Sequence, residues 1–340
     1  MRLLVTGAAG FIGSTFVHML RDEHSIVVLD KLTYAGRREN LSEDVELVVG
    51  AIEDPQAVRE LMEGCDAVVN FAAESHVDRS IADQNAFART HVIGTGVLLD
   101  AVRELGVARY VQVSTDEVYG SIEDGSFTER SPLDPSSPYS ATKAGGDLLV
   151  SAHAHTYGIE ALICRGSNNY GPRQHPEKLI PLMVLNALHG DPLPVYGDGR
   201  QVRNWLYAED FCRGIQAVLE KGRPGEAYNV GGPDECENIE VVRRILELTG
   251  ADESLVEHVR DRPGHDRRYS LSSEKIREQL GWSAQVHFDE GLARTVAWYR
   301  DNEDWWGPIR SGEYRDYYER HYGKALGGGR AASEGHGAVH

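Results

Sequence analysis

Near its amino terminus the chain reads Leu3-Leu4-Val5-Thr6-Gly7-Ala8-Ala9-Gly10-Phe11-Ile12-Gly13, and this stretch carries the first signal of the fold. The apolar residues 3–6 predict a buried strand, and the glycines that follow at a G-x-x-G-x-x-G spacing predict a tight turn into a helix. Backbone N–H groups at such a helix start can bind a pyrophosphate. The stretch therefore predicts a dinucleotide-binding unit, with a purely connecting glycine turn as the alternative.

A second apolar segment, residues 26–30, ends in the acid Asp30. A carboxylate at this place can accept hydrogen bonds from both hydroxyls of an adenosine ribose, and it repels the 2′-phosphate of NADP. We therefore expect NAD as the cofactor. Lys31 and the nearby pair Arg37-Arg38 leave NADP as an alternative, and a solvated loop acid is the alternative for Asp30.

Strand-like and helix-like segments alternate along the first half of the chain. The predicted strands cover residues 3–6, 26–30, 46–49, 67–73 with its turn, 110–113, 161–165 and 227–230. The predicted helices include residues 55–62, 86–105, 138–157 and 209–219. This alternation predicts an α/β fold with a doubly wound parallel sheet, the Rossmann arrangement.

The rhythm changes after residue 172, where short segments rich in Gly, Pro, Arg and His replace the regular alternation. We expect a dinucleotide-binding domain over residues 1–172, to which residues 204–230 return. A smaller C-terminal α/β substrate-binding lobe is expected over residues 173–203 and 231–325. Residues 326–340 are mostly small or polar and predict a disordered tail.

The composition limits the classes of partner. A formal net charge of -18 argues against nucleic acid and anionic membranes, because binding to phosphates needs a basic surface. The four cysteines are widely spaced and show no zinc pattern, so we expect reduced thiols, no metal and a cytoplasmic location. No segment resembles a signal peptide or a membrane span.

Proton-handling side chains are densest between residues 111 and 143. Thr115, Asp116 and Glu117 follow a buried strand, so they are expected at its carboxyl end, where open α/β sheets bind ligands. Ser137-Pro138 predicts the start of a helix, which places Tyr139 in its first turn and Lys143 on the same face one turn later.

These residues suit acid-base chemistry. Lys143 and a nicotinamide cation both favour phenolate over phenol and should lower the pKa of Tyr139, which makes it a proton-transfer base. Adjacent carboxyl groups split their apparent pKa values, so that Asp116 and Glu117 can hold opposite protonation states. A surface Tyr-Lys pair and a solvated Asp-Glu pair are the alternatives.

From residue 1 to about residue 322 the chain resembles the extended short-chain dehydrogenase/reductases, and among them the dTDP-glucose 4,6-dehydratases. The motifs that carry this resemblance are Leu4–Gly13, Asp30–Gly36, Ala72–Ser80, Ser114–Gly120, Ser167–Pro172, Pro176–Pro181 and Asp261–Tyr269. The glycine spacing and the Tyr-Lys pair indicate only the superfamily, whereas the ordered series is specific to the dehydratases.

The resemblance implies a hydro-lyase that converts dTDP-glucose to dTDP-4-keto-6-deoxyglucose for deoxysugar biosynthesis, for example of rhamnose. Tyr139, assisted by Thr115 and Lys143, would take the C4 hydroxyl proton while hydride passes to NAD. Glu117 would then remove the C5 proton and Asp116 would protonate the departing C6 hydroxyl, after which hydride returns to C6.

The resemblance also implies binding residues. For NAD they are Gly7, Gly10, Phe11, Ile12, Gly13, Asp30, Lys31, Thr33, Ile52, Ala72, Ala73, Thr90, Tyr139, Lys143 and Asn169. For the nucleotide-sugar they are Ser75, Thr115, Asn168, Asn169, Lys178, Leu179, Pro194, Tyr196, Arg203, Asn238, Arg267, Arg268 and Tyr269. Arginines suit a diphosphate because their guanidinium groups are permanently charged and can donate in pairs. The resemblance further implies a homodimer that pairs through the helices at 86–105 and 138–157.

Two positions depart from the family pattern. The chain has Ala51 where the family usually has an aspartate, and His91 where an asparagine is expected. We expect slightly weaker NAD binding and no change in reaction type.

The alternative functions are a UDP-glucose dehydratase, a nucleotide-sugar epimerase or decarboxylase, and a catalytically silent NAD-binding regulator. Epimerases and decarboxylases need no acid to expel the C6 hydroxyl, so the pair Asp116-Glu117 argues against both. A silent regulator would keep the glycine turn and lose the catalytic side chains.

Overall fold

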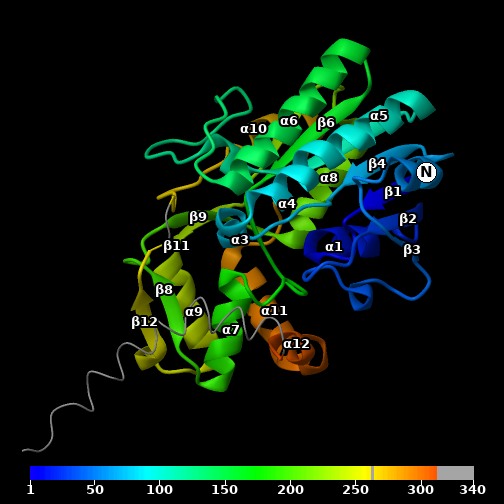
Figure 1. Cartoon of the computed structure of the whole chain (residues 1–340). Coiled ribbons are helices and arrows are strands. Elements are labelled where there is room, and N and C mark those ends of the chain that lie inside the picture. Colours follow the sequence, from blue (N-terminus) through cyan, green and yellow to red (C-terminus); the bar gives the residue numbers. More distant parts are fainter. Residues whose placement is uncertain (262–263, 312–340) are drawn as a thin grey trace, which may run out of the picture. The chain divides into compact units, whose positions relative to one another are not determined.

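The computed structural model describes residues 1–261 and 264–311, and the chain divides into two compact units (Figure 1). The first unit comprises Met1–Asn169, Arg203–Glu235 and Asp266–Phe288, and the second comprises Tyr170–Val202, Cys236–His265 and the residues from Asp289. The structure thus groups Asp266–Phe288 with the first unit, whereas the predicted substrate-binding lobe included these residues. The binding roles of the two predicted domains stay a prediction, and the predicted tail at 326–340 lies outside the described residues.

A sheet of seven parallel strands forms the centre of the first unit, in the order β10-β6-β5-β4-β1-β2-β3. The strands are β1 (Arg2–Thr6), β2 (Ser25–Asp30), β3 (Glu46–Val49), β4 (Ala67–Asn70), β5 (Arg109–Thr115), β6 (Ala161–Gly166) and β10 (Ala227–Val230). The strand order runs outward in both directions from β1, as in a doubly wound sheet. The predicted fold class is confirmed.

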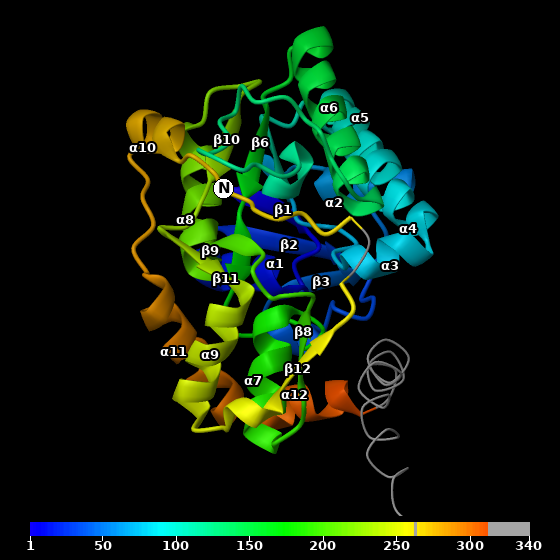
Figure 2. The same cartoon turned by 90° about the vertical axis from the view of Figure 1, so that its left-hand side faces the viewer.

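Helices cover both faces of this sheet, as Figure 2 shows, with α8 on one side of the strands and α5 and α6 on the other. Those of the first unit are α1 (Phe11–Leu20), α2 (Pro55–Met62), α3 (Val77–Ala82), α4 (Gln84–Ala88), α5 (Thr95–Leu105), α6 (Pro138–Tyr157), α8 (Ala208–Lys221) and α10 (Glu274–Leu280), with short segments η1 (Arg38–Asn40), η2 (Arg89–Gly94) and η3 (Asp116–Tyr119). One apolar core includes Phe16 of α1 and Phe211 of α8, and the other includes Leu98 of α5 and Val150 of α6. Burial on both faces explains why the strands read as continuous apolar runs.

Helix α6 begins at the predicted residue. The Ser137 hydroxyl accepts a hydrogen bond from the Ser140 backbone N–H at 3.1 Å, and the Ser140 hydroxyl accepts one from the Ser137 N–H at 3.0 Å. This reciprocal cap satisfies two N–H groups that a helix start otherwise leaves unpaired. Pro138 follows as the first helical residue, so Tyr139 lies in the first turn as expected.

The predicted helix over residues 86–105 is divided in the structure. Helix α4 ends at Ala88, the π-helical segment η2 follows, and α5 begins at Thr95. Helix α6 packs closely on this segment, because a Cβ added at Gly146 would lie 2.7 Å from the carbonyl oxygen of His91. A single apolar periodicity does not distinguish these winding states, which differ in their backbone hydrogen bonds.

The second unit is mainly helical. It contains α7 (Leu179–His189), β8 (Leu193–Tyr196), α9 (Asn238–Thr249), η4 (Glu253–Leu255), β12 (Val256–Val259), α11 (Phe288–Asp301) and α12 (Glu303–Arg310), and β12 pairs with β8 in parallel. A further sheet of three strands, in the order β11-β9-β7, is formed by Asp234–Glu237, Val202–Tyr207 and Asn168–Tyr170, and most of its residues belong to the first unit.

A fully buried carboxylate on α8 holds the segment after α10. Asp210 accepts hydrogen bonds from the backbone N–H groups of Gln285 at 2.9 Å and Val286 at 2.8 Å, and it pairs with Arg213. Its own backbone carbonyl accepts a hydrogen bond from the Trp282 indole. One side chain therefore satisfies two N–H groups from a distant part of the chain, of which that of Val286 is buried.

Asp210→Ala is expected to lower the free energy of unfolding by about 3 kcal/mol, because one buried and one partly buried N–H group lose their acceptor. Urea unfolding measures the change. The matched control is Glu209→Ala, which removes an exposed carboxylate one residue earlier on the same helix and should change stability by less than about 0.5 kcal/mol. Equal effects of the two substitutions would contradict this assignment.

Candidate active site

The glycine turn lies where β1 ends and α1 begins. Gly7 has a left-handed φ of 68°, and a Cβ added there would lie 2.5 Å from the backbone nitrogen of Ala72. A Cβ added at Gly13 would lie 2.7 Å from the Cα of Ala8. The turn can therefore hold no side chain at these positions, and the N–H groups at the start of α1 stay open to an anionic group. Gly10, Phe11 and Ile12 complete this turn as predicted.

Asp30 closes the turn from the end of β2. Its carboxylate accepts hydrogen bonds from the backbone N–H groups of Ala9 and Leu32, each at 2.8 Å, and it is 7% exposed. Burial raises its pKa, and the two backbone hydrogen bonds oppose that rise. Asp30 thus has a structural task that the sequence analysis did not foresee. Its position at the carboxyl end of β2 fits the predicted ribose contact.

The remaining predicted cofactor residues of the first unit lie at this same carboxyl edge. The Thr90 hydroxyl donates to Glu53 at 3.1 Å, and Lys31 lies 3.8 Å from the same carboxylate. Ile52 is buried against Leu98 and its neighbours on α5. Thr33, Ala72, Ala73 and Asn169 follow β2, β4 and β6 in the chain. These groups suit an adenosine portion, because they combine apolar surface with a few hydroxyl and carboxylate groups.

The short segment η3 follows directly after β5 and carries two neighbouring carboxyl groups, those of Asp116 and Glu117. The Thr115 hydroxyl caps it by accepting a hydrogen bond from the Glu117 N–H at 3.3 Å, and it donates to Asp116 at 3.2 Å. Asp116 is 2% exposed, and its Oδ2 has no hydrogen-bond partner within residues 1–261 and 264–311. Burial, together with the charge of Glu117, raises the pKa of Asp116 to about 8. Asp116 is therefore protonated at neutral pH beside a second carboxyl group.

Tyr139 and Lys143 face the sheet from α6. Tyr139 is 9% exposed and packs edge-on against Phe87 and His91, and its backbone N–H donates to the Ser80 hydroxyl at 3.2 Å. The Lys143 ammonium is 5% exposed and donates to the carbonyl of Val113 at 2.7 Å. The predicted common face of the two side chains is present in the structure.

The pKa of Tyr139 was expected to be lowered, but the protein's own groups, without bound NAD, raise it. Burial raises the pKa of Tyr139 above its ordinary value, and the charges of Glu117 and Asp116 raise it further, while a hydrogen bond from Thr115 opposes them. A lowering expected from the Lys143 ammonium leaves out the cost of desolvating the phenolate, which is the largest effect on this pKa. In a buried site desolvation outweighs one nearby cation.

His91, the family departure at an expected asparagine, is fully enclosed. Its Nδ1 lies 2.8 Å from the Thr142 hydroxyl, and its ring contacts the ring of Tyr139 at a centroid distance of 5.8 Å. Burial and the charge of Lys143 lower the pKa of His91 well below its ordinary value. The imidazole is therefore neutral and preserves a polar contact to α6 without adding charge to the site.

Arg203 and Tyr269 belong to the same electrostatic neighbourhood. The Arg203 guanidinium lies 4.4 Å from the ring centre of Tyr269 and donates to the carbonyl of Asp266 at 3.0 Å, while the Tyr269 hydroxyl donates to the Asp266 carboxylate at 2.6 Å. The charge of Arg203 lowers the pKa of Asp116, and that of Glu117 raises the pKa of Tyr269. The structure thus brings two predicted substrate residues near the two carboxyl groups.

Arg268 has contacts that hold a loop. Its guanidinium donates to both carboxylate oxygens of Glu235, at 2.9 and 3.1 Å, and to the carbonyl of Gly125 at 2.8 Å. The neighbouring Arg267 is exposed, and Ser75 and Asn168 lie in the first unit with intermediate exposure. The substrate contacts predicted for these residues stay predictions.

The other predicted substrate residues lie in the second unit. Lys178 occupies the N-cap position before α7, which Leu179 begins, and Pro194 and Tyr196 lie on β8. Asn238 begins α9, where its backbone N–H donates to the carbonyl of Gln201 at 3.0 Å. Within that unit these residues therefore come from three different elements.

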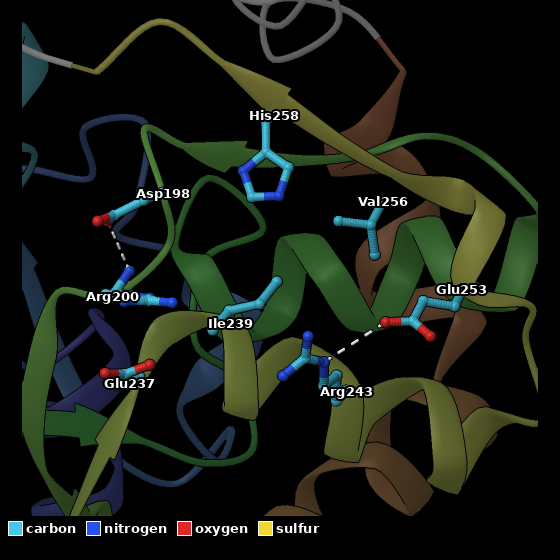
Figure 3. Close-up of a pocket in the computed structure, with 8 residues that line it drawn as sticks. All are labelled: Asp198, Arg200, Glu237, Ile239, Arg243, Glu253, Val256 and His258. Carbon is cyan, nitrogen blue, oxygen red and sulfur yellow. Dashed lines mark hydrogen bonds and ion pairs between the residues drawn. The ribbon is translucent and has the colours of Figure 1, made fainter.

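A cavity of about 450 Å³ also opens on the second unit, between side chains of opposite charge (Figure 3). It is lined by Asp198, Arg200, Glu237, Ile239, Arg243, Glu253, Val256 and His258. Figure 3 shows the Arg243 guanidinium directed at Glu253, and the two groups lie 3.4 Å apart. None of the predicted substrate residues lines it, and its charges offset one another.

Within residues 1–261 and 264–311, no group of three or more His, Cys, Asp or Glu side chains is arranged to hold a metal ion. No helix in that part of the chain has both the length and the apolar character needed to cross a membrane.

Sequence reasoning missed three residues that support the site from behind. Asp147, Arg165 and Tyr119 form a buried hydrogen-bonded chain between α6 and η3. The one available signal was the position of Asp147, four residues after Lys143 and therefore on the same helical face.

The parallel sheet, the glycine turn after β1 and the Tyr-x-x-x-Lys pair on α6 define an extended short-chain dehydrogenase/reductase. More specifically, the chain belongs to the family described as GDP-mannose 4,6 dehydratase, whose model matches residues 4–295.

Several relatives within this class are similar over nearly their whole length. A dTDP-glucose 4,6-dehydratase of Streptomyces niveus is 50% identical over 323 residues, which cover 92% of this chain and 96% of that protein. The crystal structure of DesIV, a dTDP-glucose 4,6-dehydratase from Streptomyces venezuelae with NAD and TYD bound, is 54% identical with a TM-score of 0.89 and covers 91% of this chain and 100% of that one. A UDP-glucose 4-epimerase of Thermotoga maritima with UDP-glucose is 31% identical with a TM-score of 0.84 and covers 88% and 99%. The two dehydratases are thus more similar to this chain than this epimerase is.

Asp116→Asn is expected to remove a pH-dependent loss of stability. Asp116 is protonated in the folded state up to about pH 8 but ionises near pH 4 when unfolded, so the stability that it contributes is present below about pH 4 and lost as the pH rises through about 8. The Asn variant should therefore be more stable than the wild type at about pH 9, by on the order of 5 kcal/mol at most, and much less so at about pH 5.

Denaturant unfolding at the two pH values measures this effect. Asp124→Asn, which changes an exposed loop carboxylate close in sequence, is the control and should show no such pH dependence. A difference between Asp116→Asn and the wild type that is equal at both pH values would show that Asp116 is ionised in the folded protein.

Proposed function

We propose that this chain is an NAD-dependent dTDP-glucose 4,6-dehydratase, a hydro-lyase that forms dTDP-4-keto-6-deoxyglucose for deoxysugar biosynthesis. The observation that carries the proposal is the protonated, buried carboxyl of Asp116 beside Glu117 at the end of β5. Elimination of water needs an acid for the leaving hydroxyl and a base for the adjacent C–H proton. The similarity to two dTDP-glucose dehydratases at about half identity supports the choice of substrate.

NAD would be held at the carboxyl edge of the sheet. The glycine turn at the start of α1 suits the pyrophosphate and Asp30 suits the adenosine ribose, while Tyr139 and Lys143 suit the nicotinamide ribose. When bound, NAD supplies the acceptor for hydride from C4, the donor for its return to C6, and a cation that favours the phenolate form of a nearby tyrosine.

Tyr139 acts as the base for the C4 hydroxyl. In the protein alone the phenol stays protonated because burial and the carboxyl groups of Glu117, Asp116 and Asp147 raise its pKa. Loss of the Tyr139 proton therefore requires positive charge near the phenol. Lys143 supplies one such charge, and bound NAD would supply the other. Thr115, at the end of β5, orients the C4 hydroxyl of the sugar between Tyr139 and η3, the turn that carries the carboxyl groups of Asp116 and Glu117 (the carboxylate turn).

Glu117 and Asp116 act on the second half of the reaction. Oxidation at C4 makes the C5 proton acidic, and Glu117 removes it as the general base. Asp116 then donates its proton to the C6 hydroxyl, which leaves as water, and Glu117 would return its proton to C5 when hydride returns to C6. The raised pKa of Asp116 keeps this proton available at neutral pH.

Each unit carries candidate residues for binding the nucleotide-sugar. In the first unit the candidates are Ser75, Thr115, Asn168, Asn169, Arg203, Arg267, Arg268 and Tyr269, and in the second they are Lys178, Leu179, Pro194, Tyr196 and Asn238. Arg203 is the best supported among them, because its charge already acts on Asp116.

The substrate is tested by incubating the purified protein with dTDP-glucose and, separately, with UDP-, CDP- and GDP-sugars. The alkali-induced absorbance of the 4-keto product reports turnover. We expect product from dTDP-glucose. Turnover of another nucleotide-sugar without turnover of dTDP-glucose would reassign the substrate, and an epimerised product would overturn the dehydratase.

Glu117→Gln is expected to separate the two halves of the reaction. Without a base for the C5 proton, dTDP-glucose should still be oxidised and NADH should accumulate, while product formation falls by about 100-fold or more. NADH absorbance and product assays are read in parallel. Glu123→Gln, an exposed change in the loop after η3, is the matched control, and unimpaired product formation in Glu117→Gln would refute the assigned role.

We also propose a cytoplasmic homodimer that pairs through α5 and α6. These helices lie side by side on one face of the first unit (Figure 1). Large apolar side chains are exposed on α6 (Leu148 at 61% and Tyr157 at 50%), on α5 (Leu105 at 41%) and on η2 (Ile93 at 56%). Exposed apolar side chains gathered on adjacent helices are typical of a protein interface. All four cysteines are buried and none forms a disulfide, which suits a reducing compartment.

Leu148→Asp is expected to convert the dimer to a monomer, because it places a charge in an apolar interface. Sedimentation velocity measures the change. The control is Leu248→Asp, which alters a leucine on α9 that is 39% exposed and outside the proposed interface. A dimer that persists in Leu148→Asp would move the interface elsewhere.

A further inference from the structure

Three ionisable side chains form a stripe along the buried face of α6. Tyr139, Lys143 and Asp147 follow one another at intervals of four residues and are 9%, 5% and 1% exposed. Residues at this spacing lie above one another on a helix. The proposed reaction uses the first two and gives no role to the carboxylate.

Asp147 reaches across to the sheet. Its Oδ2 accepts a hydrogen bond from Arg165 Nε at 2.8 Å, and its Oδ1 has no hydrogen-bond partner within the described residues. Arg165 lies on β6, where the strand register places it opposite Ser114 of β5, one residue before Thr115. The ion pair thus ties α6 to the sheet one turn beyond Lys143, which itself donates to Val113 of β5.

Arg165 extends the connection to the carboxylate turn. A second guanidinium nitrogen donates to the Tyr119 hydroxyl at 2.7 Å, and Tyr119 is the last residue of η3, which carries Asp116 and Glu117. That hydroxyl donates in turn to Asn229 on β10 at 2.9 Å. One guanidinium therefore contacts both the helix of Tyr139 and Lys143 and the turn of the two acids.

The stripe has an electrostatic consequence for Lys143. Burial lowers the pKa of Lys143 to about 8, and the carboxylate of Asp147 opposes that fall. From η2 the ring of His91 faces the ammonium in its neutral form, and β5 presents the uncharged carbonyl of Val113. Asp147 is therefore the anion that keeps a buried lysine charged.

A buried ion pair is weak evidence for stability, because well-packed apolar residues of similar volume often serve as well or better. The pair Asp147–Arg165 is 1% and 6% exposed and lies directly behind the catalytic side chains. A functional reason for two buried charges at this place is therefore preferable to a purely structural one.

We propose that Asp147 and Arg165 are positioning residues, in which Asp147 maintains the ammonium form of Lys143 and Arg165 holds the Tyr139–Lys143 helix in register with the Asp116–Glu117 turn. This inference deepens the proposed function and rests on it for the roles of those four residues.

The first test reads Lys143 directly. Lys143 is one of only six lysines in the chain, so its 13Cε resonance can be assigned by its absence in Lys143→Arg. Asp147→Asn keeps an oxygen acceptor for Arg165 but removes the charge, and it should lower the Lys143 pKa by about one unit. Asp147→Glu keeps the charge and should restore most of that shift.

A matched control and a second variant keep this test decisive. Asp289→Asn removes a carboxylate that lies 2.6 Å from Arg244 but is 77% exposed, and it should leave the Lys143 pKa unchanged. If Asp147→Asn does not fold, Asp147→Asn with Arg165→Gln leaves no unpaired buried charge and should still lower that pKa. An unchanged Lys143 pKa in either folded variant overturns the proposal.

The second test uses turnover of dTDP-glucose. In Asp147→Asn the decline of kcat on the alkaline side should begin about one pH unit lower, so that kcat is near the wild-type value at about pH 6 and about fivefold lower at pH 8. An alkaline limb that does not move overturns the role of Asp147. Absence of any turnover by the wild type would instead refute the proposed function, while the NMR reading of Lys143 would still stand.

The link to the carboxylate turn is tested by Tyr119→Phe. This change removes the hydroxyl between Arg165 and Asn229 but keeps the ring, which stacks on Phe127 at a centroid distance of 5.0 Å. Elimination should slow more than oxidation, so NADH should accumulate during turnover while the KM for dTDP-glucose stays within about twofold. A wild-type kcat in this variant overturns the register role of Arg165.

Discussion

The ammonium of Lys143 donates to the carbonyl of Val113, and this buried hydrogen bond of 2.7 Å joins helix α6 to strand β5. Because β5 ends in Thr115 and continues into the carboxylate turn, the same contact sets where Tyr139 meets the two acids. The reciprocal cap at Ser137 fixes the start of the helix. Small shifts of α6 would therefore misplace the base relative to the acids.

Burial sets the protonation states of this site as well as its geometry. Removing charged groups from water raises the pKa of acids and lowers that of bases. Asp116 accordingly holds its proton, and His91 is neutral. Burial also lowers the pKa of Lys143, and the carboxylate of Asp147, one helical turn away, limits this lowering. A site that must donate one proton and accept others thus depends on enclosure as much as on residue identity.

Much of the fold could be predicted because its signals are local. Apolar runs at 3–6 and 110–113, the glycine spacing and the Ser137-Pro138 start each depend on a few neighbouring residues. The division of the helix at 86–105 was missed, because a π-helical turn changes the backbone hydrogen bonds and leaves the apolar pattern intact. The loop-holding contacts of Arg268 were missed because Glu235 and Gly125 are remote in sequence.

The amino-acid sequence alone was sufficient for the parallel sheet, the glycine turn between β1 and α1, and the presence of Tyr139 and Lys143 on one helical face, since each follows from short-range geometry. It did not reveal that Asp116 keeps its proton, that the protein's own groups oppose phenolate formation at Tyr139, or that Asp147 pairs with Arg165 behind the site. Those properties arise only in the tertiary structure, because desolvation and charge pairing depend on how segments far apart in the chain enclose each group.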